Sequence, residues 1–139
     1  MVFGCAQVLM DIEPLLGLIQ GRAVLHGYTH TLAGALVIGL AAALTGRPVS
    51  ELVLRVLSIP HSPLTWRAAF AGAFIGTYSH VLLDAIMHSD MNPWWPVAAG
   101  NGLLGLIPLG LLHLICLGVG AVSALLIAFA ARRRAGYVG

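Results

Sequence analysis

Three stretches of this chain are long and apolar enough to cross a lipid bilayer as helices. A transmembrane helix needs about 20 mostly apolar residues, and residues 28–46, 67–88 and 103–131 each meet that requirement. The fold that they predict is all-α: a polytopic membrane helical bundle with three full spans and a short or truncated N-terminal helix. We expect residues 1–139 to form a single integral membrane domain.

The composition excludes a soluble globular domain. Only 9% of the 139 residues are charged, whereas soluble domains carry about 25%. All seven basic residues are arginines and the net charge is +2, so we expect no basic face for a nucleic acid. Cys5 and Cys116 each lie in apolar sequence and are expected to be small buried side chains.

Prolines and polar residues mark where the spans end. Residues 1–10 are too short to span before Asp11, so they are either a half-helix packed into the bundle or the end of a longer helix. Residues 46–66 contain three prolines and are predicted to be a polar connection, in which a short surface helix follows a Ser50 cap. Pro108 is expected either to kink the last span or to begin it.

The arginines predict how the chain is oriented. With three spans, residues 46–66 and the C-terminus share one side of the membrane, and Arg22 alone lies on the other. The positive-inside rule makes the arginine-rich side cytoplasmic, and we expect a bacterial or archaeal cell membrane. Trp94 and Trp95 suit the interface on the opposite side. The arginines of the cytoplasmic side are Arg47, Arg55, Arg67, Arg132, Arg133 and Arg134.

His80, Asp84 and His88 follow one another at intervals of four residues within the second span. Residues four apart share a helix face and are displaced by about 6 Å along the axis. His80 and His88 should therefore be about 12 Å apart, too far to bind one ion at about 2 Å. His80 and Asp84 would serve one ion, and Asp84 could bridge to a second ion near His88 or Asp90.

His26 and His30 repeat this spacing where the first span begins, and Asp11 and Glu13 lie upstream of them. The predicted topology brings these residues and those of the second span to one membrane face, the non-cytoplasmic one. Zinc, manganese and iron sites use such mixed sets of histidines and carboxylates. The predicted metal ligands are Asp11, His26, His30, His80 and Asp84.

Each of these groups also has a purely structural interpretation. An ionisable residue inside a span is costly and is usually paired, so His80 and Asp84 could simply satisfy each other. His26 and His30 could likewise form a structural pair, and Asp11 could cap a helix end. These interpretations do not explain why four separate polar elements converge on one face.

Three motifs together resemble a known family. "MDIEP", then "LHGYTHTLAGA", then "GTYSHVLLDAIMHSDMNPWWP" look like the membrane-bound metal-dependent hydrolases first noted as LexA-regulated proteins in bacteria. That family carries a D-I-[DE] element, an H-x-x-x-H-[ST] element and an H-x-x-x-D element on a membrane helix. The order of elements is similar, more remotely, to that of zinc-dependent phospholipase C. The resemblance covers residues 8 to about 101 and implies metal ligands at Asp11, His26 or His30, His80 and Asp84.

The function expected from the residues and from this resemblance is metal-dependent hydrolysis of a lipid-like phosphate ester at the non-cytoplasmic face. The expected cofactor is one or two divalent ions, zinc before manganese or iron, which would lower the pKa of a bound water toward 7. Glu13, His88 and Asp90 are the candidates for general acid or base. The expected partners are membrane lipids, and a homo-oligomer or a larger membrane complex is left open.

Two other functions are left open by the sequence. The same residues could form a structural or transport site for a metal or another ion, or the chain could be a helical assembly subunit. A transport pathway should continue with polar residues through the bilayer, but the cytoplasmic half of each span is apolar. That difference favours a surface site.

Overall fold

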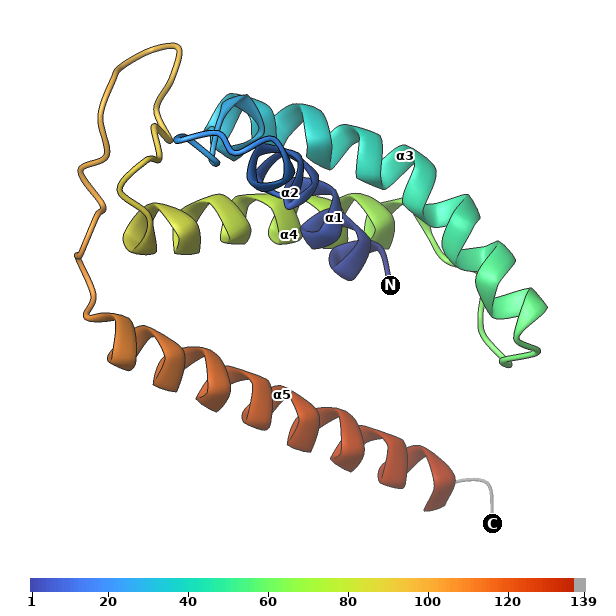
Figure 1. Cartoon of the computed structure of the whole chain (residues 1–139). Coiled ribbons are helices and arrows are strands. Elements are labelled where there is room, and N and C mark those ends of the chain that lie inside the picture. The colour runs from blue at the N-terminus through green and yellow to red at the C-terminus, as the bar shows by residue number, and fades with distance from the viewer. Residues whose placement is uncertain (137–139) are drawn as a thin grey trace. The chain divides into compact units, whose positions relative to one another are not determined.

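The computed structural model of this chain describes residues 1–136, and every regular element among them is helical. Four segments are long and apolar enough to cross a membrane, when α1 and α2 are taken together as one. The all-α prediction is confirmed, with α3, α4 and α5 as the three long helices. The elements are α1 (Val2–Met10), α2 (Ile12–Ile19), the 3₁₀ turn η1 (Tyr28–His30), α3 (Leu32–Val56), α4 (Trp66–Met87) and α5 (Leu109–Gly136) (Figure 1).

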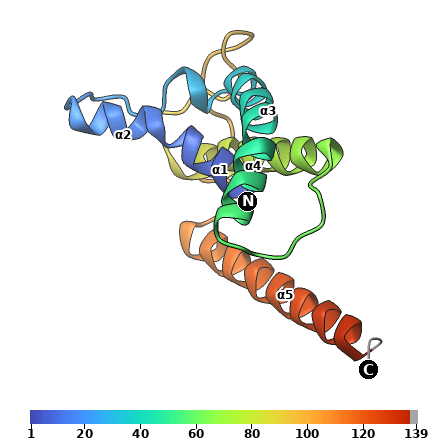
Figure 2. The same cartoon turned by 90° about the vertical axis from the view of Figure 1, so that its right-hand side faces the viewer.

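The N-terminal segment forms two short helices that meet at Asp11. Val2, Ala6 and Met10 recur at every fourth position and form the buried face of α1, which packs against both α3 and α4. Figure 2 shows α2 leading away from the α3–α4 pair. Pro14 lies in the first turn of α2, where its missing N–H costs no helical hydrogen bond. The N-terminal residues thus form a short helix that packs against α3 and α4.

Small residues allow α1, α3 and α4 to approach one another closely. A Cβ atom added at Gly39 of α3 would lie 2.7 Å from a ring carbon of Phe74 on α4. Close approach through glycine and alanine is how helices associate in lipid, where hydrophobicity alone does not drive them together. One core cluster consists of Val2, Ala6, Ala42, Ala43, Ala69 and Ala73.

The predicted polar connection at residues 46–66 is wrong in its first half. Helix α3 continues through Pro48 and ends only at Val56, so the connection shrinks to residues 57–65. Ser50 is 1% exposed inside α3 and caps no helix. A proline removes one helical hydrogen bond, but long helices of this kind tolerate it when the rest of the helix is supported.

Charged residues of α3 contact one another and hold the connection that follows the helix. Glu51 lies 3.6 Å from Arg47 and 3.8 Å from Arg55. Its Oε1 also accepts a hydrogen bond from the backbone N–H of Leu64, at 3.1 Å, and the Arg47 side chain donates to the Leu64 carbonyl at 2.7 Å. The connection is therefore tied to the end of α3.

The described chain forms two compact units, which divide after Leu104. Helix α5 belongs to the second unit and begins directly after Pro108, whose carbonyl accepts a hydrogen bond from Leu112 N–H at 3.0 Å. Pro108 thus marks the start of the last helix and does not kink it. All eight residues predicted to form the site lie in the first unit.

Candidate metal centre

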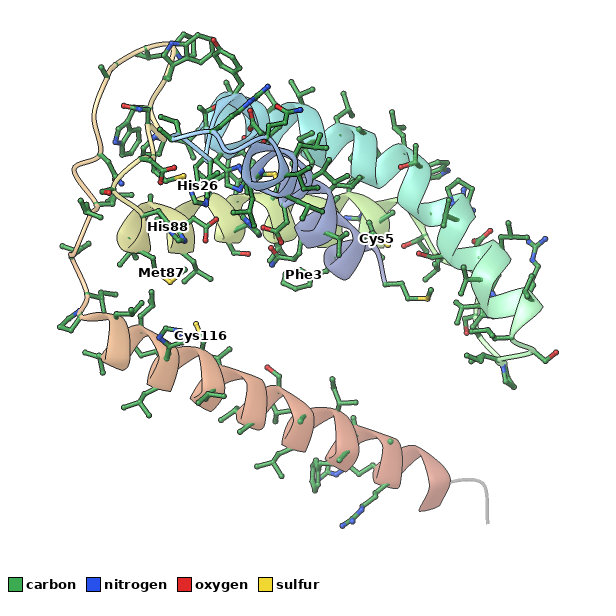
Figure 3. All side chains as sticks on the ribbon, in the orientation of Figure 1. Phe3, Cys5, His26, Met87, His88 and Cys116 are labelled. Carbon is green, nitrogen blue, oxygen red and sulfur yellow. The ribbon has the colours of Figure 1, made fainter. Side chains whose placement is uncertain are left out.

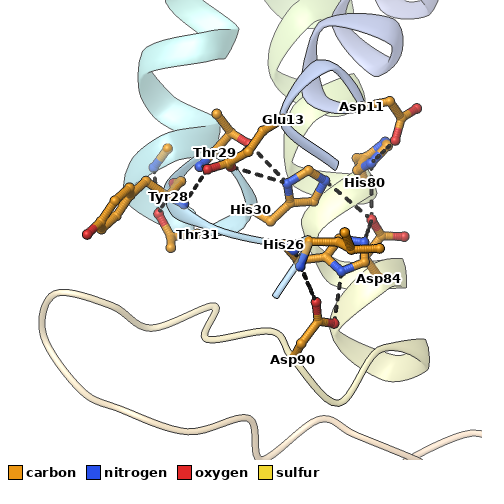
Figure 4. Close-up of polar contacts among 12 residues, drawn as sticks. Asp11, Glu13, His26, Tyr28, Thr29, His30, Thr31, His80, Asp84 and Asp90 are labelled. Carbon is orange, nitrogen blue, oxygen red and sulfur yellow. Dashed lines mark hydrogen bonds and ion pairs between the residues drawn. The ribbon is translucent and has the colours of Figure 1, made fainter. Parts of the chain in front are cut away.

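Three segments far apart in the sequence meet at one end of the first unit. They are the C-terminal end of α1, the turn that precedes α3, and the C-terminal part of α4 (Figure 4). Two groups of potential ligand atoms result, and within each group the atoms lie within 4.8 Å of one another. The first group is Asp11, His30 and His80, and the second is His26, Asp84 and His88.

Asp84 lies where the two groups meet. Its Oδ2 atom is 3.1 Å from His80 Nε2, 3.6 Å from His30 Nε2 and 4.0 Å from His26 Nε2. Ligand atoms around a tetrahedral ion at about 2 Å are about 3.3 Å apart. The carboxylate thus lies between the nitrogen atoms of the two groups and could serve an ion on either side.

The histidine rings are held from behind through their Nδ1 atoms. His80 Nδ1 lies 2.6 Å from Gln7 Oε1, His26 Nδ1 lies 2.9 Å from Asp90 Oδ1, and His30 Nδ1 lies 3.0 Å from Thr29 Oγ1. When Nδ1–H donates to such an acceptor, the lone pair is left on Nε2. Metal-binding histidines are typically oriented in this way by a second layer of residues.

Two buried nitrogen atoms have no hydrogen-bond partner among the described residues, and both point into this centre. They are Nε2 of His30 and Nε2 of His80. Buried polar atoms are nearly always satisfied, so such exceptions need an explanation. The His80 atom is also 3.2 Å from Asp11 Oδ1. A lone pair so close to two carboxylates requires either a proton or a cation between them, and a divalent metal ion fits this donor set.

The electrostatics of His30 suit a metal ligand. The side chain is fully buried. Burial, and next the neighbouring His26, lower the pKa of His30 to about 4, against the opposing effect of Asp84. The ring is therefore neutral at pH 7, which is the form of histidine that binds metals.

Glu13 lies behind His30, on the side away from the Nε2 atom. Its carboxylate accepts hydrogen bonds from the backbone N–H of Tyr28 at 3.2 Å and of Thr29 at 2.8 Å, and from the Thr29 hydroxyl. A side chain at Gly27 would collide with this carboxylate. Glu13 thus clamps η1 onto α2 and sets the position of Thr29, which in turn contacts His30.

Asp90 lies behind His26 in a similar way. Burial acts to raise its pKa, but hydrogen bonds from the backbone N–H groups of Leu25 and His26 and from the His26 ring lower the pKa of Asp90 to about 2. The carboxylate is therefore charged at neutral pH. His88, by contrast, stacks on the His26 ring with 4.3 Å between ring centroids (Figure 3). Of the three predicted acid–base residues, the structure brings only His88 among the ligand atoms.

Two residues of this centre were missed by sequence reasoning. Gln7 carries an amide within an otherwise apolar stretch, and it precedes Asp11 by four residues on the same helix. That spacing was a usable signal, because residues four apart lie one turn from each other on the same face of a helix. Thr29 gave no signal of its own, because a threonine beside a histidine in a turn is common.

The segment that follows α4 covers the centre from one side. The Asn101 side chain donates to the carbonyl oxygens of Ala85, at 2.7 Å, and of His88, at 3.1 Å. Leu32 N–H at the start of α3 donates to the Pro93 carbonyl at 2.8 Å. These bonds bring Trp95 to Tyr28, with 4.9 Å between the ring centroids.

No family model matches this chain, and no curated protein or solved structure matches it either. The fold and the site define it as an all-helical chain with several helices apolar enough to cross a membrane, and with histidine and aspartate groups able to hold a metal ion.

Proposed function

We propose that this protein is a membrane-embedded, metal-dependent hydrolase of lipid-like phosphate esters that works at the non-cytoplasmic face. The observation that carries the proposal is the convergence of three histidine Nε2 atoms on one Asp84 oxygen. Two of these nitrogens are buried without a hydrogen-bond partner in the described chain. Two adjoining ligand groups with a carboxylate between them are typical of two-metal phosphoesterases.

The proposed mechanism assigns separate roles to the bound ions, to His88, and to Glu13 and Asp90. When bound, divalent ions, with zinc as the first candidate, would supply Lewis-acid chemistry that polarises the phosphate and makes water a better nucleophile at neutral pH. Water adds to phosphorus as the ester P–O bond breaks, and the leaving oxygen takes up a proton. We assign proton transfer to His88, which would then not be a metal ligand itself; its ring lies against that of His26 and close to Asp84. Glu13 and Asp90 hold the rings of His30 and His26 in place.

The packing below the centre supports a surface site over a passage through the membrane. Between α1, α3 and α4 lies a cluster of valine and alanine side chains that are buried and apolar. An ion that left the centre in this direction would meet no charged group there. Such a closed end suits a site that receives its substrate from one face.

The distribution of charge supports the orientation. The arginines of α3 and of the start of α4 lie at the end of these helices opposite the candidate metal centre. By the positive-inside rule that end is cytoplasmic, and the centre then faces outward. Trp94 and Trp95 are each close to half exposed beside the centre, as expected at headgroup depth.

The test measures both the metal content of the purified protein and its hydrolysis of a phosphate ester. Purified protein in lipid nanodiscs would be analysed for metals by mass spectrometry and assayed with bis(p-nitrophenyl) phosphate. We expect near-stoichiometric zinc, manganese or iron in the wild type, and loss of both metal and turnover in Asp84→Ala and His80→Ala. The matched control is Glu51→Gln, which removes a carboxylate at the other end of α3 and should change neither.

Two outcomes would contradict the proposal. Equal metal content in the wild type and in a folded Asp84→Ala variant would show that the metal is bound elsewhere. In the second outcome, Asp84→Ala loses the metal, but the metal-loaded wild type cleaves neither bis(p-nitrophenyl) phosphate nor a phospholipid. That result would indicate a structural metal site without hydrolase activity.

A further inference from the structure

Two largely apolar hollows lie beside the candidate metal centre, and the nearer one is lined in part by His26 of the second ligand group. The near hollow has a volume of about 310 Å³ and is lined by Val24, His26 and Trp95 among others. The far hollow also has a volume of about 310 Å³, and its lining includes Val37 and Ile38 of α3. His26 thus belongs both to the wall of the near hollow and to the candidate metal centre.

The two hollows are neighbours. Tyr28, Thr31 and Trp95 belong to the walls of both. The ring pair of Tyr28 and Trp95 therefore stands between them, with 4.9 Å between centroids. Together the hollows lead from His26, past this aromatic pair, to Val37 and Ile38 of α3.

The chemistry of the lining indicates what could occupy such a path. Apart from His26, the lining of the two hollows contains no histidine, aspartate, glutamate, lysine or arginine, so a charged group would find no ionic partner there. Val37 is 66% exposed on a helix that is apolar enough to span a membrane. The far end of the path would therefore open into the hydrocarbon of the bilayer, and the near end meets a ring of the metal centre.

We propose that these two hollows form a groove that binds a hydrocarbon chain of the substrate, so that the enzyme selects phosphate esters with a long unbranched chain. This rests on the proposed function, which supplies the phosphate end of the molecule. The phosphate lies at the metal centre beside His26, and the chain passes the Tyr28–Trp95 pair and runs along α3 beside Val37. Trp95 is then a specificity residue, because it lines both hollows.

The first measurement is a chain-length series. Ethyl, hexyl and decyl p-nitrophenyl phosphates carry the same reacting group and differ only in the alkyl chain. In the metal-loaded wild type, kcat/KM should rise by up to about fourfold for each CH₂ that enters the groove. Equal kcat/KM for all three esters would overturn the groove while leaving the proposed hydrolase intact.

Two matched variants separate binding in the groove from partitioning into the nanodisc lipid. Val37→Phe narrows the far hollow, and Leu36→Phe places the same side chain on the adjacent, 53% exposed position that lines neither hollow. The ratio of decyl to ethyl turnover should fall by about tenfold or more in Val37→Phe, the equivalent of two CH₂ groups excluded from the groove, and stay unchanged in Leu36→Phe. The same ratio in both variants would refute the assignment.

A binding measurement tests the groove without turnover. The double variant Trp66→Phe/Trp94→Phe keeps Trp95 as the one tryptophan of the chain's three, and decyl phosphate brominated at its chain end serves as the quencher. Quenching of Trp95 should saturate, be reversed by unbrominated decyl phosphate, and weaken in the Val37→Phe background. Saturable quenching without hydrolysis would retain the groove and reject the hydrolase; linear quenching that decyl phosphate does not reverse would reject the groove.

Discussion

Each of the three histidines that face Asp84 has a different acceptor behind its ring. Gln7 offers an amide oxygen to His80, Thr29 a hydroxyl to His30, and Asp90 a carboxylate to His26. The stronger the acceptor, the more electron density the ring can give to a metal. The three rings are thus oriented alike but would not be equivalent as metal ligands.

Replacement of Gln7 tests this second layer directly. Gln7→Leu removes the acceptor for His80 Nδ1–H without touching a ligand atom, so metal affinity should fall by about 10–100-fold. Gln7→Glu keeps an acceptor at the same distance and should retain most of the affinity. Competition titrations against a chelating dye would measure both; unchanged affinity in Gln7→Leu would mean that Gln7 does not orient His80.

Sequence spacing could predict the stripe of His80, Asp84 and His88, because helix geometry fixes which residues share a face. It could not predict the contacts between His80 and Gln7 or between His26 and Asp90. These pairs are separated by 73 and 64 residues, so their contact depends on how whole helices pack. The packing of whole helices cannot be read from spacing, so the sequence suggested Asp90 as a general acid or base. In the structure its carboxylate instead contacts Nδ1 of His26.

At the scale of elements, the turn that carries His30 is folded tightly onto the start of α3. The Thr31 hydroxyl accepts a hydrogen bond from Gly34 N–H at 2.8 Å and donates to the Tyr28 carbonyl at 2.9 Å. Thr31 thus caps α3 and closes η1 with one side chain. The Tyr28 carbonyl approaches Gly34 so closely that a Cβ atom there would collide with it.

This packing makes Gly34 a sensitive position. Gly34→Ala should destabilise the protein by about 1–3 kcal/mol, because the added methyl group must displace backbone and not a flexible side chain. The matched control is Gly102→Ala, where an added Cβ atom would meet nothing within 4 Å. Unfolding midpoints in mixed micelles, followed by circular dichroism, would compare the two. Equal midpoints would show that η1 can shift at little cost.

The helices differ in how well their bounds could be predicted. Helix α4 runs from Trp66 to Met87, one residue from the predicted span at each end, because its apolar run is bounded by polar and proline-rich sequence. Helix α3 was expected to end near Gly46, because Pro48 resembled a stop signal. The helix instead continues to Val56. Proline is tolerated inside membrane helices when the surrounding structure satisfies the freed backbone groups, and local sequence does not report that surrounding structure.

At the scale of the whole molecule, the proposed orientation predicts which loops face which compartment. In a Cys5→Ser/Cys116→Ser background, Val97→Cys and Ser58→Cys each place one thiol on a different side of the membrane. Val97 is 93% exposed in the segment that follows α4, and Ser58 lies in the connection between α3 and α4. A membrane-impermeant maleimide should label Val97→Cys in intact cells, and Ser58→Cys only after permeabilisation. The reverse pattern would invert the orientation and place the centre inside.

The origin of the ligands in three separate segments also bears on how the chain matures. Asp11 enters the membrane with the first helices, His26 and His30 with the start of α3, and His80 and Asp84 with α4. Neither ligand group is complete until the last of these has been synthesised and inserted. Metal binding adds its free energy only to the fully assembled state. Under the proposed function, the supply of metal outside the cell would then govern how many newly made chains escape degradation by membrane proteases.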